Sequence, residues 1–230
     1  MVHRGKQEIW SSVLPGEATG PLADDTGILT ALEELHLSPG GVFALRPREE
    51  AEIVTYVYLG SLTQEDSTGN SGVVHAGEFQ RMITGSGIRH KETNASRTAW
   101  AHTFRVFLRP SEVGLEGSRE QRRFAAAQRH NVLCVVASPD GRRGSLRLLQ
   151  NALIYSSVLD SGHHLIHELL PGRSAWLHII HGETTLRDVN LSAGDGAGIT
   201  QESAVSLTAQ ESTELLLVDL GHRRGRSPAR

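Results

Sequence analysis

Ile53-Val-Thr-Tyr-Val-Tyr-Leu-Gly60 is a run of β-branched and aromatic residues that stops at a glycine. Such residues favour β-strands, and a run that is apolar at successive positions suits a sheet covered on both faces. A second run, Ala175-Trp-Leu-His-Ile-Ile-His-Gly182, has the same form. In both copies another glycine, Gly40 or Gly162, lies 20 residues before the one that ends the run. The sequence therefore predicts a β-unit that occurs twice.

The rest of the chain consists mainly of short apolar runs separated by Gly, Asn, Asp and Pro. These runs include residues 101–108, 131–137, 145–149, 152–159 and 214–220. Many short strands with frequent turns are typical of sandwiches and barrels. We expect an all-β protein built from two stacked antiparallel β-barrels of jelly-roll type, with short helices or loops at the connectors.

The repeat also sets the expected domain boundaries. We predict an N-terminal barrel with its connector over residues 1–132, a C-terminal barrel over 133–221, and a basic, disordered tail over 222–230. The apolar spacing of residues 28–37 allows a short helix or a loop-packed segment, and residues 119–129 could form a second helix on the connector.

Charge and cysteine content narrow the function classes. The chain has 230 residues and a net charge of −3, and the tail carries four arginines and no acid, so the rest is more acidic than the total suggests. An acidic body argues against a nucleic-acid-binding protein. Cys134 is the single cysteine, which excludes an intramolecular disulfide and a cysteine-based metal site. With no apolar run of about 18 residues and no signal-like N-terminus, we expect a cytoplasmic protein without a membrane partner.

Several stretches in both halves resemble the pirins, which are bicupin proteins that include bacterial enzymes with quercetin 2,3-dioxygenase activity. The matching stretches are residues 52–60, 66–70, 76–82 and 85–92 in the first half, and 138–142, 144–146 and 193–197 in the second. The resemblance covers roughly residues 35 to 220 and implies a bicupin fold.

The resemblance also implies a metal site, which this chain keeps only in part. In the family, the N-terminal barrel holds one metal, usually iron, through three histidines and one glutamate. His90 and Glu92 match two of those ligands, but Arg46 and Arg48 stand where the other two histidines are expected. A guanidinium stays protonated and has no lone pair for a metal. We therefore predict a degenerate site without a metal cofactor.

The two arginines suggest a replacement for the metal. Arg46 and Arg48 are two residues apart, as are His90 and Glu92, so each pair shares one face of its strand. We hypothesise that both guanidinium groups enter the barrel and that one or both pair with Glu92. In the alternative, both arginines point to solvent and the pocket has collapsed.

The first function hypothesis is metal-independent acid/base chemistry on a small molecule, such as isomerisation, cyclisation or dehydration. His90 would transfer the proton, and Glu92 would orient the imidazole of His90. Arg46 and Arg48 would stabilise a developing oxyanion. The resemblance implies an aromatic or polyketide-like substrate. Residues that could line its site are Tyr56, Tyr58, Phe79, Met82 and His102.

Two alternatives stay open. The first is a quercetin 2,3-dioxygenase-like oxygenase that retains iron or another divalent transition metal through His90, Glu92 and His102. The second is a non-catalytic regulatory or binding protein with a protein partner. We assign no metal to the histidines of the second half and expect them on a polar strand surface or facing the connector. They are His163, His164, His167, His178 and His181.

Overall fold

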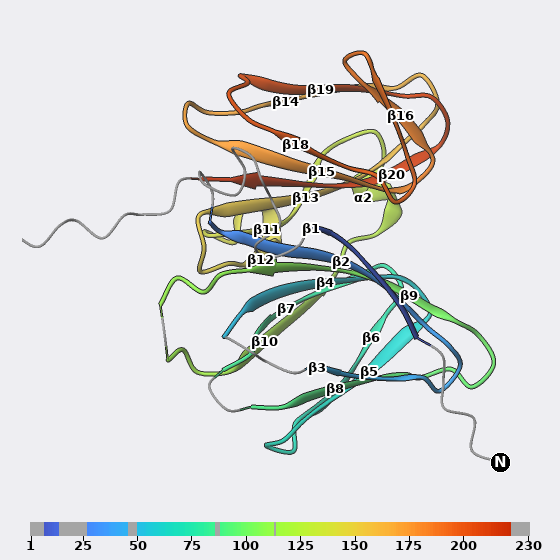
Figure 1. Ribbon diagram of the computed structural model, residues 1–230, viewed down its shortest axis with the longest axis vertical. Helices are drawn as coiled ribbons and strands as arrows, with labels where there is room; N and C mark the ends of the chain where they lie inside the picture. Colours follow the sequence, from blue (N-terminus) through green and yellow to red (C-terminus); the bar gives the residue numbers. More distant parts are fainter. Residues whose placement is uncertain (1–6, 14–26, 46–49, 86–87, 113, 222–230) are drawn as a thin grey trace, which may run out of the picture.

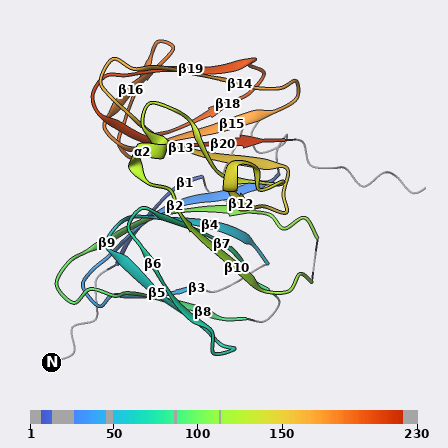
Figure 2. The same ribbon diagram turned by 180° about the vertical axis from the view of Figure 1, so that it is seen from behind.

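The computed structural model describes residues 7–13, 27–45, 50–85, 88–112 and 114–221. Almost all regular structure in these residues is β-strand, which confirms the predicted all-β fold (Figures 1 and 2). Each half of the chain forms a six-stranded and a four-stranded sheet. Within the described part of the chain, no helix has the length and hydropathy needed to cross a membrane.

The N-terminal half pairs its strands in two layers. The six-stranded sheet runs in the order β1 (Gln7–Val13), β2 (Leu29–Leu37), β9 (Ala101–Leu108), β4 (Glu52–Leu59), β7 (Glu78–Ile83) and β10 (Ser118–Arg123). The four-stranded sheet runs in the order β3 (Val42–Leu45), β8 (His90–Asn94), β5 (Ser61–Asp66) and β6 (Ser71–His75).

The C-terminal half repeats this plan. Its larger sheet runs β12 (Leu146–Arg147), β11 (Cys134–Ser138), β13 (Ala152–Leu159), β20 (Thr213–Leu220), β15 (Ser174–His181) and β18 (Gly196–Ile199). Its smaller sheet runs β14 (His164–Glu168), β19 (Ala204–Ala209), β16 (Glu183–Leu186) and β17 (Val189–Ser192). The predicted repeat is real, because the two quoted runs form β4 and β15 in equivalent places.

The glycines that end these two runs are required by close packing. Gly60 and Gly182 have backbone φ angles of 79° and 84°, which residues other than glycine rarely adopt. A Cβ on Gly60 would lie 3.0 Å from the Cα of Ala101, and one on Gly182 would lie 2.3 Å from the carbonyl oxygen of Ser212. Each strand therefore turns tightly against the backbone of a neighbour.

Most of the residues in the two predicted helices form β-strands instead. Residues 28–37 belong largely to strand β2, which pairs with β1 on one side and β9 on the other. Residues 119–129 contain most of β10 and only one short helix, α2 (Ala126–Arg129). The apolar residues of β2 serve two cores: Leu35 and Leu37 face the barrel interior, while Leu32 packs against the other half. This two-sided burial produced a spacing that resembles a helix.

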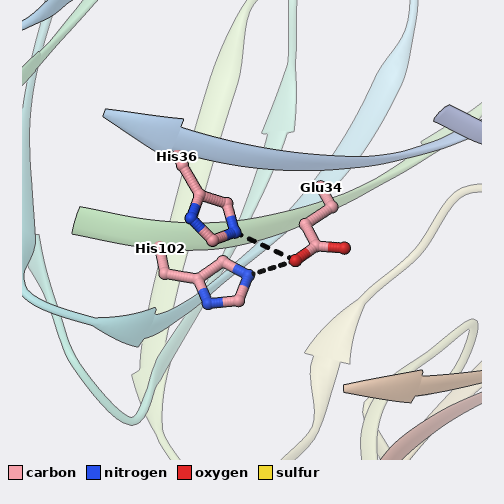
Figure 3. Close-up of side chains that lie close together, drawn as sticks. All are labelled: Glu34, His36 and His102. Carbon is pink, nitrogen blue, oxygen red and sulfur yellow. Dashed lines mark hydrogen bonds and ion pairs between the residues drawn. The ribbon is translucent and has the colours of Figure 1, made fainter. Parts of the chain in front are cut away.

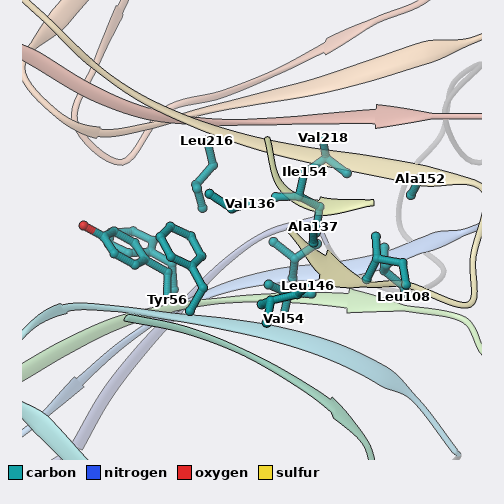
Figure 4. Packing of buried hydrophobic residues seen from close by; sticks show 14 of the residues in the cluster. Val54, Tyr56, Leu108, Val136, Ala137, Leu146, Ala152, Ile154, Leu216 and Val218 are labelled. Carbon is teal, nitrogen blue, oxygen red and sulfur yellow. The ribbon is translucent and has the colours of Figure 1, made fainter. Parts of the chain in front are cut away.

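The two large sheets face each other and share a hydrophobic core (Figures 1 and 4). Val54, Tyr56 and Leu108 enter it from the N-terminal half, and Ile154 and Val218 enter it from the C-terminal half. Burial of apolar surface from both sheets stabilises their contact, at about 25 cal/mol per Å².

Polar groups also cross between the halves. The Tyr56 hydroxyl donates to Glu214 Oε1 at 2.5 Å, and Arg129 Nη1 donates to the same oxygen at 2.5 Å. The carboxylate of Glu52 accepts the backbone N–H groups of Leu149 and Gln150, at 2.9 Å and 3.2 Å. These bonds fix the orientation of one large sheet on the other. The predicted domain boundaries stay a prediction, and the tail lies outside the described residues.

Candidate metal centre

His90 and Glu92 are buried on strand β8, and both already have protein partners. His90 Nε2 donates to the carbonyl oxygen of Thr84 at 3.0 Å, and its Nδ1 lies 3.4 Å from Nη2 of Arg119. The carboxylate of Glu92 accepts a hydrogen bond from Gln64 Nε2 at 3.0 Å. Neither side chain is presented as a free ligand.

The buried cation beside Glu92 is Arg105, which the sequence analysis did not name. Its Nη2 donates to Glu92 Oε2, and its Nη1 lies 3.9 Å from Glu33 Oε2. The guanidinium also lies 4.3 Å from the centre of the Phe43 ring, a cation–π contact. Burial raises the pKa of Glu33, and the charge of Arg105 partly opposes this effect. Arg46 and Arg48 lie outside the described residues, so their proposed entry into the barrel stays a prediction.

The barrel interior therefore fits a metal poorly among the described residues. The sequence retains two of the family ligands. The imidazole of His90 is hydrogen-bonded to the carbonyl oxygen of Thr84, and the carboxylate of Glu92 is paired with the guanidinium of Arg105. A metal at Glu92 would compete with the Arg105 cation for the same carboxylate, and it would bring further positive charge next to a buried guanidinium, which is costly.

The residues expected to line a substrate site lie mostly outside this barrel. Tyr56 and Phe79 stack with ring centres 4.3 Å apart and belong to the core between the halves. The ring of Tyr58 is nearly perpendicular to that of His102, with ring centres 5.3 Å apart. Met82 is buried on β7, at a position next to Arg81, which faces the C-terminal half. The predicted set therefore does not form one cavity.

A different group of side chains that could bind a metal lies on the other face of the large N-terminal sheet, which is turned away from the barrel interior and toward the C-terminal half (Figure 3). His102 Nε2 and His36 Nε2 lie 2.7 Å and 3.0 Å from the same oxygen, Oε1 of Glu34. The ligand atoms of all three residues lie within 4.8 Å of one another. Among the described residues, this is the one group of three or more histidine, cysteine or acidic side chains with that spacing.

Strand pairing brings this Glu34–His36–His102 cluster together. His36 of β2 lies directly opposite His102 of β9, and Glu34 is two residues before His36 on the same face. The two imidazole rings are 3.9 Å apart between centres. The side chains of Glu34, His36 and His102 are 18%, 31% and 14% exposed, so solvent reaches the cluster.

The electrostatics favour a cation at this position. Burial alone would raise the pKa of Glu34, but hydrogen bonds from His102 and His36 outweigh it and hold the pKa at about 2. The carboxylate is therefore ionised at neutral pH, and it draws two imidazoles toward one oxygen. Two imidazoles and one carboxylate are the donor set of non-haem iron(II) oxygenases.

The sequence analysis placed His102 among the candidates but missed Glu34 and His36. The apolar spacing of residues 28–37 predicts a helix or a loop, and on a helix residues two apart do not share a face. The signal that could have found them is Glu-x-His with period-2 spacing, once the segment is taken as a strand. His102 lies with these two residues, whereas the oxygenase alternative from the sequence placed it with His90 and Glu92.

The C-terminal histidines do not form one polar surface. His164 and His181 are exposed, and His167 binds Asp219 at 2.9 Å. His178 departs from the prediction, because it is 1% exposed on strand β15. Burial lowers the pKa of His178 to about 4, although the charges of Glu34 and Asp195 act in the other direction, so its ring is neutral at pH 7.

Both halves match families of known proteins. The family described as Pirin matches residues 24–108, and the quercetinase C-terminal cupin domain matches residues 135–220. The chain is 38% identical over 184 residues to a quercetin 2,3-dioxygenase of Escherichia coli, covering 80% of this chain and 78% of the relative. This chain belongs to the pirin family.

Solved pirins have the same fold. The crystal structure of YhhW from Escherichia coli has a TM-score of 0.83 and 31% identity, and the match covers 98% of this chain and 95% of that one. Bacterial pirin YhhW in complex with nickel(II) has a TM-score of 0.81 and 32% identity, and covers 94% and 92%. These likenesses confirm the predicted bicupin fold.

The prediction that this pirin has no metal cofactor was wrong. Relatives named quercetin 2,3-dioxygenase, a nickel(II)-bound structural neighbour and the cluster at Glu34 all point to a metal-binding cupin. The barrel positions that the resemblance supplies do not include these three residues. The residues that fit a metal lie on the other face of the same sheet.

Proposed function

We propose that this pirin is a metal-dependent oxygenase of the quercetin 2,3-dioxygenase kind, in which Glu34, His36 and His102 hold the metal. The observation that carries the proposal is the convergence of two imidazole nitrogens and one carboxylate oxygen within 4.8 Å. The names of the relatives support the reaction class, and the nickel(II) complex of a neighbour supports a divalent transition metal. The proposal replaces isomerase, cyclase or lyase chemistry with the metal-dependent alternative.

The chain supplies the charge and the geometry that such a metal needs. A divalent ion held by two imidazoles and one carboxylate keeps open positions at which oxygen or a substrate oxygen can bind. Glu34 contributes a full negative charge because its pKa is far below neutral. His36 and His102 already direct Nε2 to the carboxylate, so a metal would bind these nitrogens in the tautomer that carries its proton on Nδ1.

Aromatic side chains beside the cluster fit a flat substrate. Tyr58 is partly buried, and its ring is nearly perpendicular to that of His102. Leu59, next to Tyr58 in sequence, is 53% exposed. Tyr58 and Leu59 offer apolar contact next to the proposed metal ligands, as small-molecule sites require, whereas Phe104 is 1% exposed and packs against His102 from the core. A flavonol or related aromatic enol is the substrate class that suits both the relatives and this surface.

The test combines metal content with turnover. Protein loaded with iron(II) or nickel(II) and freed of excess should hold one equivalent and consume oxygen with quercetin. His36→Ala and His102→Ala should each lower metal content and turnover at least tenfold. His75→Ala serves as the control, because His75 is exposed on β6 and lies outside the cluster. Full metal content in the doubly substituted His36→Ala/His102→Ala protein would overturn the proposal.

A further inference from the structure

His178 lies on the opposite half of the molecule and packs against Phe104, a neighbour of the metal-ligand cluster. It lies on β15 between Trp176 and Ile180, two residues that pack in the core shared by the halves. Its ring centre is 5.5 Å from that of Phe104, which in turn is 4.7 Å from the ring of His102. His178 also lies near enough to Glu34 and His102 for their charges to act on it.

The surroundings of His178 do not explain why an imidazole stands there. Neither Nδ1 nor Nε2 has a hydrogen-bond partner among the described residues, and the side chain is 99% buried. Buried polar groups nearly always have a partner, and an unpaired one costs free energy that an apolar residue would avoid. The neighbours on its strand face are apolar, so a leucine or phenylalanine would suit the packing better. The position therefore calls for a ligand of the imidazole.

We propose that His178 is the contribution of the C-terminal half to the metal site. A metal bound to Glu34, His36 and His102 would recruit His178 as a fourth ligand, and would thereby tie the two cupin halves together. This inference rests on the proposed function, because it assumes that the metal binds the cluster.

Recruitment involves a movement of His178. The residue is not one of the three whose ligand atoms lie within 4.8 Å of each other, so a shared metal would require the ring of His178 to move closer to them. One nitrogen of the neutral imidazole carries a lone pair that can coordinate a metal, and no hydrogen bond to a described residue has to break first. Metal binding is then coupled to the contact between the two large sheets.

The test measures metal affinity and ligand number together. Affinity for nickel(II) is obtained by competition with a chromophoric chelator, and the number of coordinated imidazoles by pulsed EPR on the copper(II)-loaded protein. Wild type should show three imidazoles. His178→Phe, which keeps the packing volume, and His178→Ala should show two, with affinity at least tenfold weaker. His181→Ala is the matched control, since His181 is an exposed histidine on the same strand.

The outcomes separate this inference from the proposed function. One outcome overturns the inference and leaves the proposed function intact. In it, His102→Ala loses the metal, His178→Phe keeps the wild-type affinity, and two imidazoles are counted in both wild type and His178→Phe. If wild type binds no stoichiometric metal, the proposed function itself is overturned. Urea unfolding of each variant checks the fold, and the phenylalanine variant is expected to unfold no earlier than wild type.

Discussion

Arg105 and Glu92 form an ion pair inside the N-terminal barrel, and both side chains are almost completely withdrawn from solvent. The pair joins strands β9 and β8, which belong to different sheets of the barrel. It places a permanent cation on the one acidic ligand that the pirin resemblance retains. The barrel interior thus combines an apolar core with a buried ion pair, and the proposed metal ligands lie on the opposite face of the large sheet.

Breaking this pair should destabilise the barrel strongly. Glu92→Gln leaves the buried Arg105 charge with only Glu33, at 3.9 Å, as an acidic partner, so we expect the free energy of unfolding to fall by about 3 kcal/mol in urea titrations. Glu65→Gln is the matched control, because Glu65 pairs with Lys91 at 3.4 Å on the surface and should cost less than about 1 kcal/mol. Equal effects of the two substitutions would contradict the buried pair.

The polar contact between the halves should be measurable as well. Tyr56→Phe removes the 2.5 Å hydrogen bond to the Glu214 carboxylate while keeping the stacked ring, so we expect a loss of about 1.5–3 kcal/mol in the free energy of unfolding. Tyr155→Phe is the control, since the Tyr155 hydroxyl makes no hydrogen bond within the described residues. A loss no larger than the control's would show that Tyr56 contributes packing alone.

Asp66 should make the free energy of unfolding depend on pH in the acid range. Burial alone would raise the pKa of Asp66, but hydrogen bonds from Thr68 and Asn70 outweigh it and hold that pKa below its usual range. Arg119 Nη2 also pairs with Asp66 at 3.0 Å. Because the folded pKa is depressed, the stabilisation is fully present above about pH 3.8 and is lost as pH falls from there toward the folded value.

The variant Asp66→Asn tests this dependence. It should be less stable than wild type at pH 7, and the difference in the free energy of unfolding should shrink between pH 4 and pH 2.5. Denaturant titrations at several pH values follow the change. A difference that stays constant across this range would contradict the assigned pKa shift.

A bound metal should stabilise the folded protein by mass action. At a free nickel(II) concentration about 100 times the dissociation constant, we expect an increase of about 2.7 kcal/mol in the free energy of unfolding. The increase should vanish in His36→Ala/His102→Ala and persist in His75→Ala. If the double variant is stabilised equally, nickel(II) binds elsewhere.

The sequence was sufficient for the architecture because two different signals agreed. The repeated apolar runs ending at Gly60 and Gly182 predicted the duplicated β-unit, and the turn clusters predicted many short strands. Residues 28–37 were misread because β2 buries side chains on both faces, which hides its period of two.

The candidate site was less predictable because it depends on partners far apart in sequence. Glu34 and His36 meet His102 only through the pairing of β2 with β9, and His178 approaches only because the two large sheets face each other. Arg105 gave no motif at all, since a single arginine in an apolar run has no characteristic spacing. Arg46 and Arg48, which the sequence did single out, lie outside the described residues.

Metal stoichiometry in paired variants tests the central claim most directly. Elemental analysis of the nickel(II)- or iron(II)-loaded protein should give one equivalent for wild type and for His90→Ala, and well under 0.1 equivalent for the Glu34→Gln/His36→Ala/His102→Ala protein. The opposite pattern, with the metal lost in His90→Ala and retained in the triple variant, would return the metal to the barrel interior and contradict a centre at Glu34, His36 and His102.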